Sequence, residues 1–336
     1  MARYPIDLPD SYSPNHSSVA QASFSSTRFD PKLSTPFLQK SLSEQTRAAY
    51  RRTITEFFIF QANCQPQQVT GQMVAAWRDH LLRKRRKPST VAFKLSVIRS
   101  FFGYLQAGGL ISINPASTKL VPLPPLAEDS VGRALTTHEV QSLLAGPNRA
   151  ISEGARDYAL LLTALRLSLR VSELCSLRVS SIKLSRGRWV IQCKVKGGRE
   201  RLLPLPKEVK EAIDHYMRLD AKRRRLVGSD GPDAFLFQPH SNARTLIYDK
   251  PLTRSMAWKI VARWGEYGAI GKICPHDLRR TAITRALDQG LSYRQVQMMS
   301  GHKDPKTVMR YDLGKQNLDL NAINFLNYTS DENESA

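Results

Sequence analysis

The sequence predicts a mainly helical protein with one small antiparallel sheet, an α+β fold divided into two domains. Apolar residues recur at helical spacing through residues 43–106, which is typical of helices that bury one face. A proline-rich stretch with few periodic apolar residues follows at 119–132, as expected of an interdomain linker. Strand-like alternation occurs at residues 189–195, and a glycine turn separates it from a second strand at 200–205.

Three helices are expected in the first domain. The first begins near Ser43 and the second covers residues 70–84, each with apolar residues spaced for one buried face. The third covers residues 89–106, and the pair Gly108-Gly109 ends it. These elements predict a small helical bundle.

The chain before this bundle has a different composition. Residues 1–40 are rich in Ser, Pro and Asn and have little periodicity. Such a segment is expected to be a polar N-terminal arm or a poorly ordered tail. The first domain is therefore expected to span residues 41–117, and a linker is expected at 118–133.

The second domain is expected at residues 134–316. It begins with a capped helix, because Thr136 precedes Glu139 at capping-box spacing. A buried helix at 157–167, the strand hairpin and further helices from residue 208 follow. The last segment, 317–336, is apolar in part but too short to form a core alone. Folding back onto its own chain is one way for this segment to bury its apolar residues.

The charge balance indicates the class of partner. The chain of 336 residues has 50 Lys and Arg against 29 Asp and Glu, a net charge of +21. This excess favours a polyanion such as DNA, because each phosphate neutralised releases condensed counterions. A merely cationic protein is the alternative that charge alone leaves open.

The cellular compartment follows from features that the sequence lacks. No apolar run reaches the roughly 18 residues of a membrane span, and residues 1–29 lack the pattern of a signal peptide. The four cysteines form no CxxC pair and are expected to be free thiols. A cytoplasmic, nucleoid-associated protein is predicted.

Four stretches of the second domain carry residues suited to one reaction. In the first, Arg170 stands three residues before Glu173, so a guanidinium able to clamp a phosphate has a carboxylate to orient it. In the second, Lys196 lies before the tip of a basic hairpin, where an ammonium group is placed to protonate a leaving alkoxide. Each motif alone is also explained by a structural ion pair or a solvated turn.

The other two stretches add histidines and a tyrosine. His276 and Arg279 are three residues apart at a helix start, so both side chains can point the same way. Tyr311 lies nine residues after His302, about two turns into the helix expected after residue 304. In-line attack on a phosphodiester builds negative charge that fixed cations stabilise. A phenol nucleophile must lose its proton, which an adjacent histidine assists.

Metal-dependent phosphoryl transfer lacks its ligands here. No cluster of Asp and Glu occurs at metal-ligand spacing. We therefore expect neither a metal nor another cofactor.

The order Arg…Lys…His-x-x-Arg…Gly-His…Tyr over residues 43–316 resembles the tyrosine recombinase, or phage integrase, family. The resemblance implies that Arg170 and Arg279 bind the phosphate and that Glu173 supports the first of them. It implies that Lys196 is the general acid, that His276 accepts the tyrosine proton and that Tyr311 is the nucleophile. His302 fills the family's His or Trp position. One departure is that the family often has a glycine just before its first arginine, where this chain reads Leu-Ser-Leu-Arg.

The resemblance also implies an architecture and partners. A helical core-binding domain and a catalytic domain would form a C-shaped clamp on double-stranded DNA with inverted half-sites. Four protomers would act together, with two active at a time and a need for accessory proteins left open. The segment 317–336 would dock on a neighbouring protomer, with folding back in cis as the open alternative. Site-specific recombination through a 3′-phosphotyrosyl intermediate, without metal or ATP, is the expected activity.

Two other functions remain open from the sequence. A type IB-like topoisomerase would share the chemistry, and a non-catalytic DNA-binding regulator would share the fold. Basic residues expected on helices of the first domain are candidates for DNA contact: Arg51, Arg52, Lys94 and Arg99. Arg280 points away from His276 and Arg279 on the expected helix, so a surface position or a DNA-backbone contact is expected for it.

Overall fold

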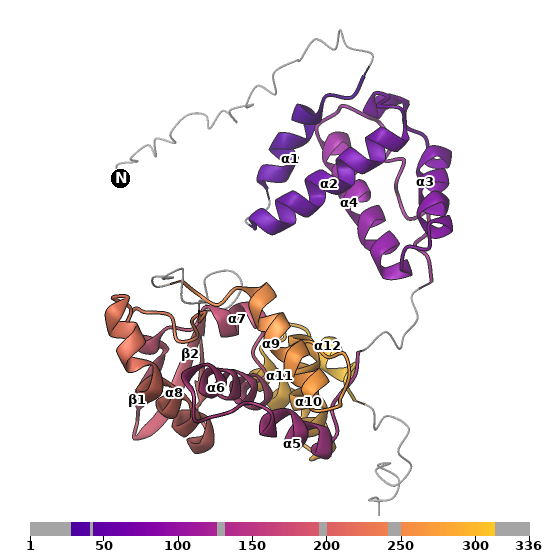
Figure 1. The fold of residues 1–336 in the computed structure, drawn as a ribbon. Coiled ribbons are helices and arrows are strands. Elements are labelled where there is room, and N and C mark those ends of the chain that lie inside the picture. The colour runs from indigo at the N-terminus through magenta and orange to yellow at the C-terminus, as the bar shows by residue number, and fades with distance from the viewer. Residues whose placement is uncertain (1–27, 41–42, 126–131, 195–199, 241–249, 313–336) are drawn as a thin grey trace, which may run out of the picture. The chain divides into compact units, whose positions relative to one another are not determined.

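The computed structural model describes residues 28–40, 43–125, 132–194, 200–240 and 250–312. The chain divides between Glu128 and Asp129 into two compact units (Figure 1). The described residues are mainly helical with one three-stranded antiparallel sheet. The predicted fold class is therefore confirmed.

The first unit is a helical bundle. Its main helices are α2 (Glu44–Phe60), α3 (Gly71–Arg83) and α4 (Pro88–Ala107), and its short elements are η1 (Pro31–Ser34), α1 (Thr35–Gln39) and η2 (Pro66–Gln68). The three predicted helices are present. The first begins one residue after its expected start, and the other two lie within one residue of both expected ends. Their buried faces meet in an aromatic core, where the ring of Phe57 lies edge-on to Trp77 and Phe102.

The end of the predicted polar arm belongs to this bundle. Phe29 is buried and stacks on Phe58 with 3.6 Å between ring centroids. Phe37 and Leu38 are buried in the same core. The polar expectation was wrong for residues 28–40, because a few widely spaced apolar side chains suffice to dock a short helix. Residues 1–27 lie outside the described residues.

Packing also continues past the expected end of the first domain. Ala116 and Val121 are buried in the same aromatic core. Arg99 donates hydrogen bonds to both of their carbonyl oxygens, at 2.8 and 3.1 Å. The chain up to Val121 is thus packed in the first unit.

The second unit contains the sheet, eight α-helices and one 3-10 helix among its described residues. Its elements are α5 (Thr137–Ala145), α6 (Ser152–Leu167), α7 (Val171–Cys175), η3 (Val179–Ser181), β1 (Ile182–Ser185), β2 (Arg188–Lys194), β3 (Glu200–Pro204), α8 (Lys207–Leu226), α9 (Arg254–Tyr267), α10 (Pro275–Asp288), α11 (Tyr293–Ser300) and α12 (Pro305–Met309). The capping box of Thr136 and Glu139 is present at the start of α5.

The sheet has the order β1-β2-β3, with Ile191 at its centre opposite Ile182 and Leu203. The hairpin of β2 and β3 was predicted, but β1 was not. Four residues are too few for alternation to be recognised in the sequence. The buried helix was predicted from residue 157, and α6 begins five residues earlier.

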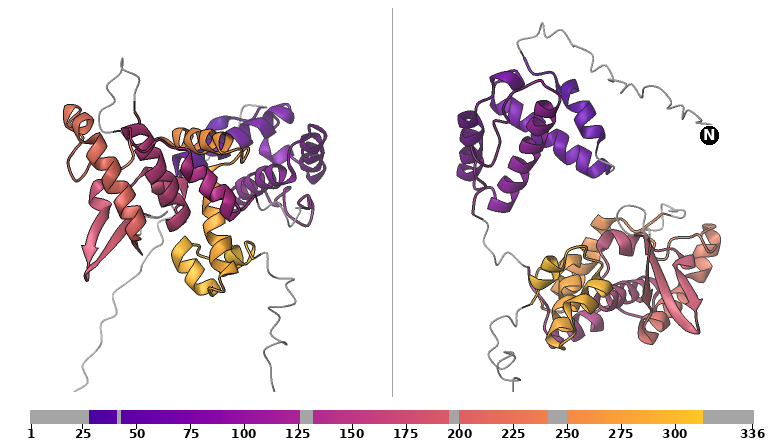
Figure 2. Two further views of the ribbon diagram at one scale, coloured as in Figure 1. Left: turned by 60° about the horizontal axis from the view of Figure 1, so that its bottom comes forward. Right: turned by 180° about the vertical axis from the view of Figure 1, so that it is seen from behind.

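Helix α6 is the centre of the second unit. It lies between the sheet with α8 on one side and α10 to α12 on the other (Figures 1 and 2). A smaller apolar cluster joins α10, α11 and α12 and includes Ile283, Val296, Val308 and Tyr311. The C-terminal end of α6 therefore faces the elements that carry the histidines and the tyrosine.

No helix among the described residues is long and apolar enough to cross a membrane. All four cysteines are free. Burial raises the pKa of the Cys175 and Cys193 thiols to about 11.

Candidate active site

The turn after α6 places the first arginine. Ser168 has left-handed backbone angles, with φ 51° and ψ 34°, and redirects the chain into α7. Arg170 is the N-cap residue of α7. Residues with a Cβ adopt this conformation at a cost, so the turn that presents Arg170 is strained at Ser168.

Glu173 holds Arg170 from one side. Its Oε1 accepts from the guanidinium at 2.9 Å, and its Oε2 accepts from the Arg170 backbone N–H at 3.0 Å. The Glu173 side chain is 4% exposed whereas that of Arg170 is 41% exposed. The guanidinium is therefore oriented by a buried carboxylate and still reaches solvent, where a phosphate would arrive.

The C-terminal end of α11 gathers three arginines. The consecutive carbonyl oxygens of Met299, Ser300 and Gly301 accept from Arg201, Arg279 and Arg170 respectively, at 3.0, 2.8 and 3.3 Å. The last carbonyls of a helix lack intrahelical partners and carry partial negative charge. This helix end therefore binds a cluster of cations without neutralising their charge.

Gly301 is required at this point for two reasons. Its φ is +69°, in the left-handed region that favours glycine. A Cβ there would also lie 2.3 Å from Nη1 of Arg201. The close approach of Arg201 to the end of α11 depends on the missing side chain.

Arg201 was not identified as a site residue from the sequence. It lies on β3 opposite Cys193, whose side chain is buried, and it also donates to Oε2 of Glu173 at 3.3 Å. The only indication that the Arg201 side chain points inward is that it pairs with a buried residue. Recognising this pair requires knowing how β2 and β3 are aligned in the hairpin.

Arg279 is buried at 2% exposure on α10. It donates to the carbonyl oxygens of Ser168 and Ser300 and to Nε2 of His302. Burial, and next the charge of Arg170, lower its pKa to about 10. The guanidinium remains charged at neutral pH and connects the ends of α6 and α11.

His302 is held as a neutral imidazole. Its Nε2 lies 3.0 Å from Nη2 of Arg279, which can only donate, and its Nδ1 lies 2.9 Å from Oγ of Ser300. This geometry assigns the proton to Nδ1. Burial, followed by the charges of Arg279 and Arg170, lowers the pKa of His302 to about 4.

Tyr311 lies next to this histidine. Its ring centroid is 5.8 Å from that of His302, and the side chain is 7% exposed. Helix α12 ends at Met309, so Tyr311 lies in the turn after it, with its N–H bonded to the carbonyl oxygen of Val308. The expectation of a position two turns into the helix was wrong, because α12 has only five residues.

His276 lies in the first turn of α10 and is exposed at the edge of the site. Desolvation by the surrounding protein, followed by the charges of Arg280 and Arg279, lowers its pKa. A neutral imidazole at this position is available as a proton acceptor.

Arg280 does not lie on the surface. It is 5% exposed, donates to the carbonyl oxygen of Gly132 and covers the ring of Tyr311, 5.2 Å from its centroid. The expected surface position is therefore wrong, whereas the expected DNA-backbone contact stays a prediction. Helical geometry correctly indicated that the side chains of Arg280 and Arg279 point in different directions. The turn after α12, which contains Tyr311, packs on the face of α10 that carries Arg280.

Lys196 lies outside the described residues. Strand β2 ends at Lys194 and β3 begins at Glu200, so the hairpin that was expected to carry it is present up to its tip. Among the described residues, no group of three or more His, Cys, Asp and Glu side chains is arranged to hold a metal ion.

The candidates in the first unit differ in exposure. Arg51 and Arg52 are exposed on α2 and line a shallow pocket with Ile59. Lys94 is paired with Glu56. Arg99 donates to the backbone carbonyls described above, which gives it a structural role, and its expected DNA contact stays a prediction.

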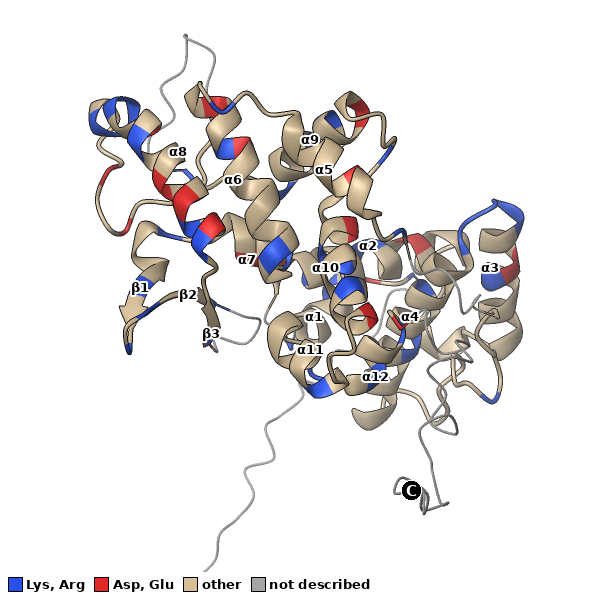
Figure 3. Cartoon of the chain, turned by 90° about the horizontal axis from the view of Figure 1, so that it is seen from below, with Lys and Arg blue, Asp and Glu red and all other residues tan. Residues whose placement is uncertain are grey.

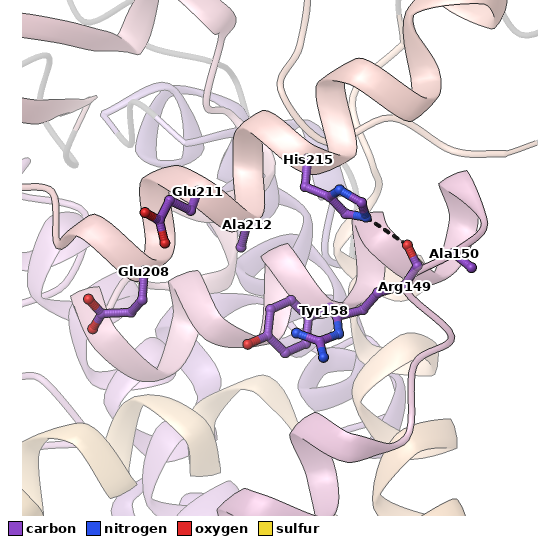
Figure 4. Close-up of a pocket in the computed structure, with 7 residues that line it drawn as sticks. All are labelled: Arg149, Ala150, Tyr158, Glu208, Glu211, Ala212 and His215. Carbon is purple, nitrogen blue, oxygen red and sulfur yellow. Dashed lines mark hydrogen bonds between the residues drawn. The ribbon is translucent and has the colours of Figure 1, made fainter.

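A pocket on the second unit lies apart from these residues. It is formed between α8 and the start of α6 by Arg149, Ala150, Tyr158, Glu208, Glu211, Ala212 and His215 (Figure 4). His215 lies 2.8 Å from the carbonyl oxygen of Arg149, whose guanidinium covers the Tyr158 ring. None of the predicted catalytic residues lines this pocket.

Comparison with protein families identifies the class. Residues 133–316 match the phage integrase family, and residues 33–109 match the N-terminal SAM-like domain of phage integrases. The chain belongs to the phage integrase family.

Relatives of known function are similar over most of the chain. A tyrosine recombinase XerC from Roseiflexus sp. (strain RS-1) is 32% identical over 286 residues, which cover 81% of this chain and 84% of that protein. A tyrosine recombinase XerD from Pseudomonas putida is 32% identical over 290 residues, which cover 84% and 91%. The chain is thus a tyrosine-type site-specific recombinase, and the topoisomerase and regulator alternatives are not favoured.

Solved structures share the fold. The XerH site-specific recombinase bound to a palindromic difH substrate has a TM-score of 0.66 and 17% identity, covering 86% of this chain and 83% of that chain. A lambda integrase dimer bound to a COC′ core site has a TM-score of 0.63 and 16% identity, covering 84% and 96%.

Proposed function

We propose that this recombinase cleaves double-stranded DNA by attack of Tyr311 on a backbone phosphate, without metal or ATP. The observation that carries the proposal is the assembly of Arg170, Arg279, His302 and Tyr311 around the ends of α6 and α11. These residues come from stretches up to 141 positions apart (170 to 311). In-line attack of a phenol on a phosphodiester is a reaction that uses all of them.

The arginines are proposed to bind the phosphate that is cut. Attack in line makes a pentacoordinate phosphorus with additional negative charge, which pre-placed cationic donors stabilise. Arg170 is oriented by Glu173 and partly exposed, so it can receive a phosphate oxygen. Arg279 supplies a second positive charge near Arg170.

The bond changes balance without a further reactant. The Tyr311 oxygen forms a bond to phosphorus and loses its proton to His276, and the bond from phosphorus to the 5′-oxygen breaks. Lys196 gives a proton to that oxygen. His302 cannot accept the phenol proton at Nε2 while Arg279 donates there, which favours His276. The 5′-hydroxyl of a partner strand then attacks the phosphotyrosine in the reverse sense, so the bond energy is kept.

The proposed substrate is DNA with two inverted half-sites, bound by a tetramer in which two protomers are active at a time. Positive charge supports a DNA partner: Lys and Arg gather at the end of α8 and around α3 (Figure 3). Arg51 and Arg52 on α2 are the proposed contacts in the first unit. Docking of residues 317–336 on a neighbouring protomer, nucleoid association and accessory proteins belong to the same proposal.

A suicide substrate tests the chemistry. The DNA carries the recombination site with a nick near the cleavage point, so that a short fragment diffuses away and cleavage is trapped. Denaturing gels in EDTA are expected to show a covalent protein–DNA band with the wild type and none with Tyr311→Phe. A band that persists in Tyr311→Phe, or that disappears with EDTA, would contradict the proposed nucleophile or the metal-free reaction respectively.

A further inference from the structure

Arg280 is a buried cation that the proposed chemistry does not use. It directly follows Arg279 on α10 and is 5% exposed. Its Nη1 donates to the carbonyl oxygen of Gly132 and its Nε has no partner among the described residues. No carboxylate in the described part of the chain forms an ion pair with it. Burying a guanidinium on such terms is costly, so the position needs a compensating interaction.

The ring of Tyr311 provides that interaction. The guanidinium carbon of Arg280 lies 5.2 Å from the ring centroid, within the range in which the quadrupole of an aromatic ring attracts a cation. Such contacts are stronger when both groups are removed from water, and Tyr311 is 7% exposed. The stacked His302 ring contacts the same tyrosine. Arg280 and His302 together restrict the ring.

Gly132 completes the arrangement on the other side of Arg280. A Cβ at this position would lie 2.9 Å from Oδ1 of Asp277 and 3.5 Å from Nη1 of Arg280. The first distance is shorter than real Cβ contacts, so a side chain at 132 would displace the α10 groups. Glycine therefore allows the backbone to approach closely enough to accept from Arg280.

We propose that Arg280 is a positioning residue for the nucleophile, holding the Tyr311 ring through its charge while Gly132 anchors the guanidinium. This inference rests on the proposed function, because it assumes that Tyr311 is the residue that attacks. Arg280 acts on the placement of the phenol and does not itself contact the phosphate. Its removal is therefore expected to slow cleavage and to leave DNA binding unchanged.

The test compares Arg280→Met with Arg280→Lys in the full chain. Methionine keeps much of the length and removes the charge, whereas lysine keeps the charge. Single-turnover cleavage of the nicked substrate and DNA affinity over a salt series are both measured. Loss of a buried cation–π contact is expected to slow cleavage by about tenfold in Arg280→Met, and Arg280→Lys is expected to recover most of that loss. Affinity and its salt dependence should match the wild type for both variants.

The matched control is Arg285→Met on the same helix. Arg285 donates to Oγ1 of Thr137 at an exposed site. The Arg285→Met variant is expected to cleave DNA at the wild-type rate. Gly132→Ala is the second probe, since it disturbs the anchor without removing the charge, and slower cleavage is expected from it as well. If Arg280→Met fails to fold, the cleavage rate of Gly132→Ala tests the positioning role in its place.

Three outcomes would overturn the inference. Wild-type cleavage by Arg280→Met would remove any role for the charge. Equal losses in the Met and Lys variants would mean that the shape of arginine, and not its charge, acts. Weaker DNA binding with a smaller salt dependence would identify Arg280 as a phosphate contact. Failure of the wild type to form a Tyr311-dependent adduct would instead contradict the proposed function, so the two failures are distinguishable.

Discussion

Ser168 combines two unfavourable features at the turn between α6 and α7. Its backbone is left-handed, with φ 51°, and its side-chain oxygen is buried with no hydrogen-bond partner among the described residues. Replacing Ser168 should therefore stabilise the second unit.

The two contributions can be estimated separately. An unpaired buried hydroxyl costs about 1–3 kcal/mol, and Ser168→Ala removes it at the expense of a small void, so a gain of about 1 kcal/mol is expected. Relief of the left-handed strain contributes about 1–2 kcal/mol, from which the greater freedom of unfolded glycine subtracts about 0.4–1 kcal/mol. Ser168→Gly should then gain roughly 1.5–2 kcal/mol in total.

Ala269→Gly is the control for the strain contribution. Ala269 has φ 55° but is exposed and has no hydroxyl to desolvate, so only about 0.5–1 kcal/mol is expected. Calorimetry of the full chain follows the unfolding of the second unit, where 1 kcal/mol corresponds to a shift of about 2–4 °C in Tm. A Tm of Ser168→Ala at or below that of the wild type would refute the reasoning about the hydroxyl. Equal Tm values for Ser168→Ala and Ser168→Gly would refute the reasoning about strain.

Three further outcomes are expected. Arg170→Ala and Arg279→Ala should each reduce cleavage by about 100- to 1,000-fold, the loss typical of one transition-state donor; near-wild-type cleavage rates would exclude the phosphate-binding role. Lys196→Ala should be rescued by a substrate with a 5′-bridging sulfur, because a thiolate leaves without a general acid; an unrescued rate would argue against proton donation by Lys196. The folded-state pKa of His302 is depressed from 6.5 to about 4, so the stability that its neutral form contributes is complete above pH 6.5 and declines as pH falls towards 4. In His302→Asn the denaturation midpoint should vary less with pH over this range, and parallel profiles for the two proteins would contradict the assignment.

Helix positions and the order of chemical residues could be predicted because each depends on local sequence. The helices α3 and α4 follow from apolar spacing, and the His-x-x-Arg pair is contained within one helical turn. The inward direction of Arg201 could not be predicted, since it depends on the register that places it opposite Cys193. Nor could the burial of Arg280, which requires the turn after α12 to pack on α10.

The docking of Phe29 on Phe58 shows a different limit. Periodicity identifies a helix when several apolar residues repeat within it. Residues 28–40 present too few of them, and their composition is dominated by polar residues. What decides their structure is an apolar surface left uncovered by α2 and α4, which is visible only after those helices have been packed.

Backbone carbonyl oxygens are the main acceptors for the four arginines of the site, and this affects how much of their charge is available to a substrate. The four are Arg170, Arg201, Arg279 and Arg280. Arg279 and Arg280 are bonded to carbonyl oxygens at Ser168, Ser300 and Gly132. Glu173 is the one carboxylate that pairs with any of the four within the described residues. A carboxylate for each arginine would orient it equally well but would cancel its charge. Carbonyl oxygens fix the direction of a guanidinium while leaving its net charge available.

Desolvation, and after it the excess positive charge, lowers the pKa of the two neighbouring histidines. Arg279 and Arg170 contribute to the low pKa of His302, and Arg280 and Arg279 to that of His276. Both imidazoles are therefore neutral at physiological pH, when one is needed to accept a proton. A bound phosphate would offset part of the positive charge and raise both pKa values. His276 would thus become a stronger base once DNA is in place, which couples proton transfer from the tyrosine to the presence of the substrate.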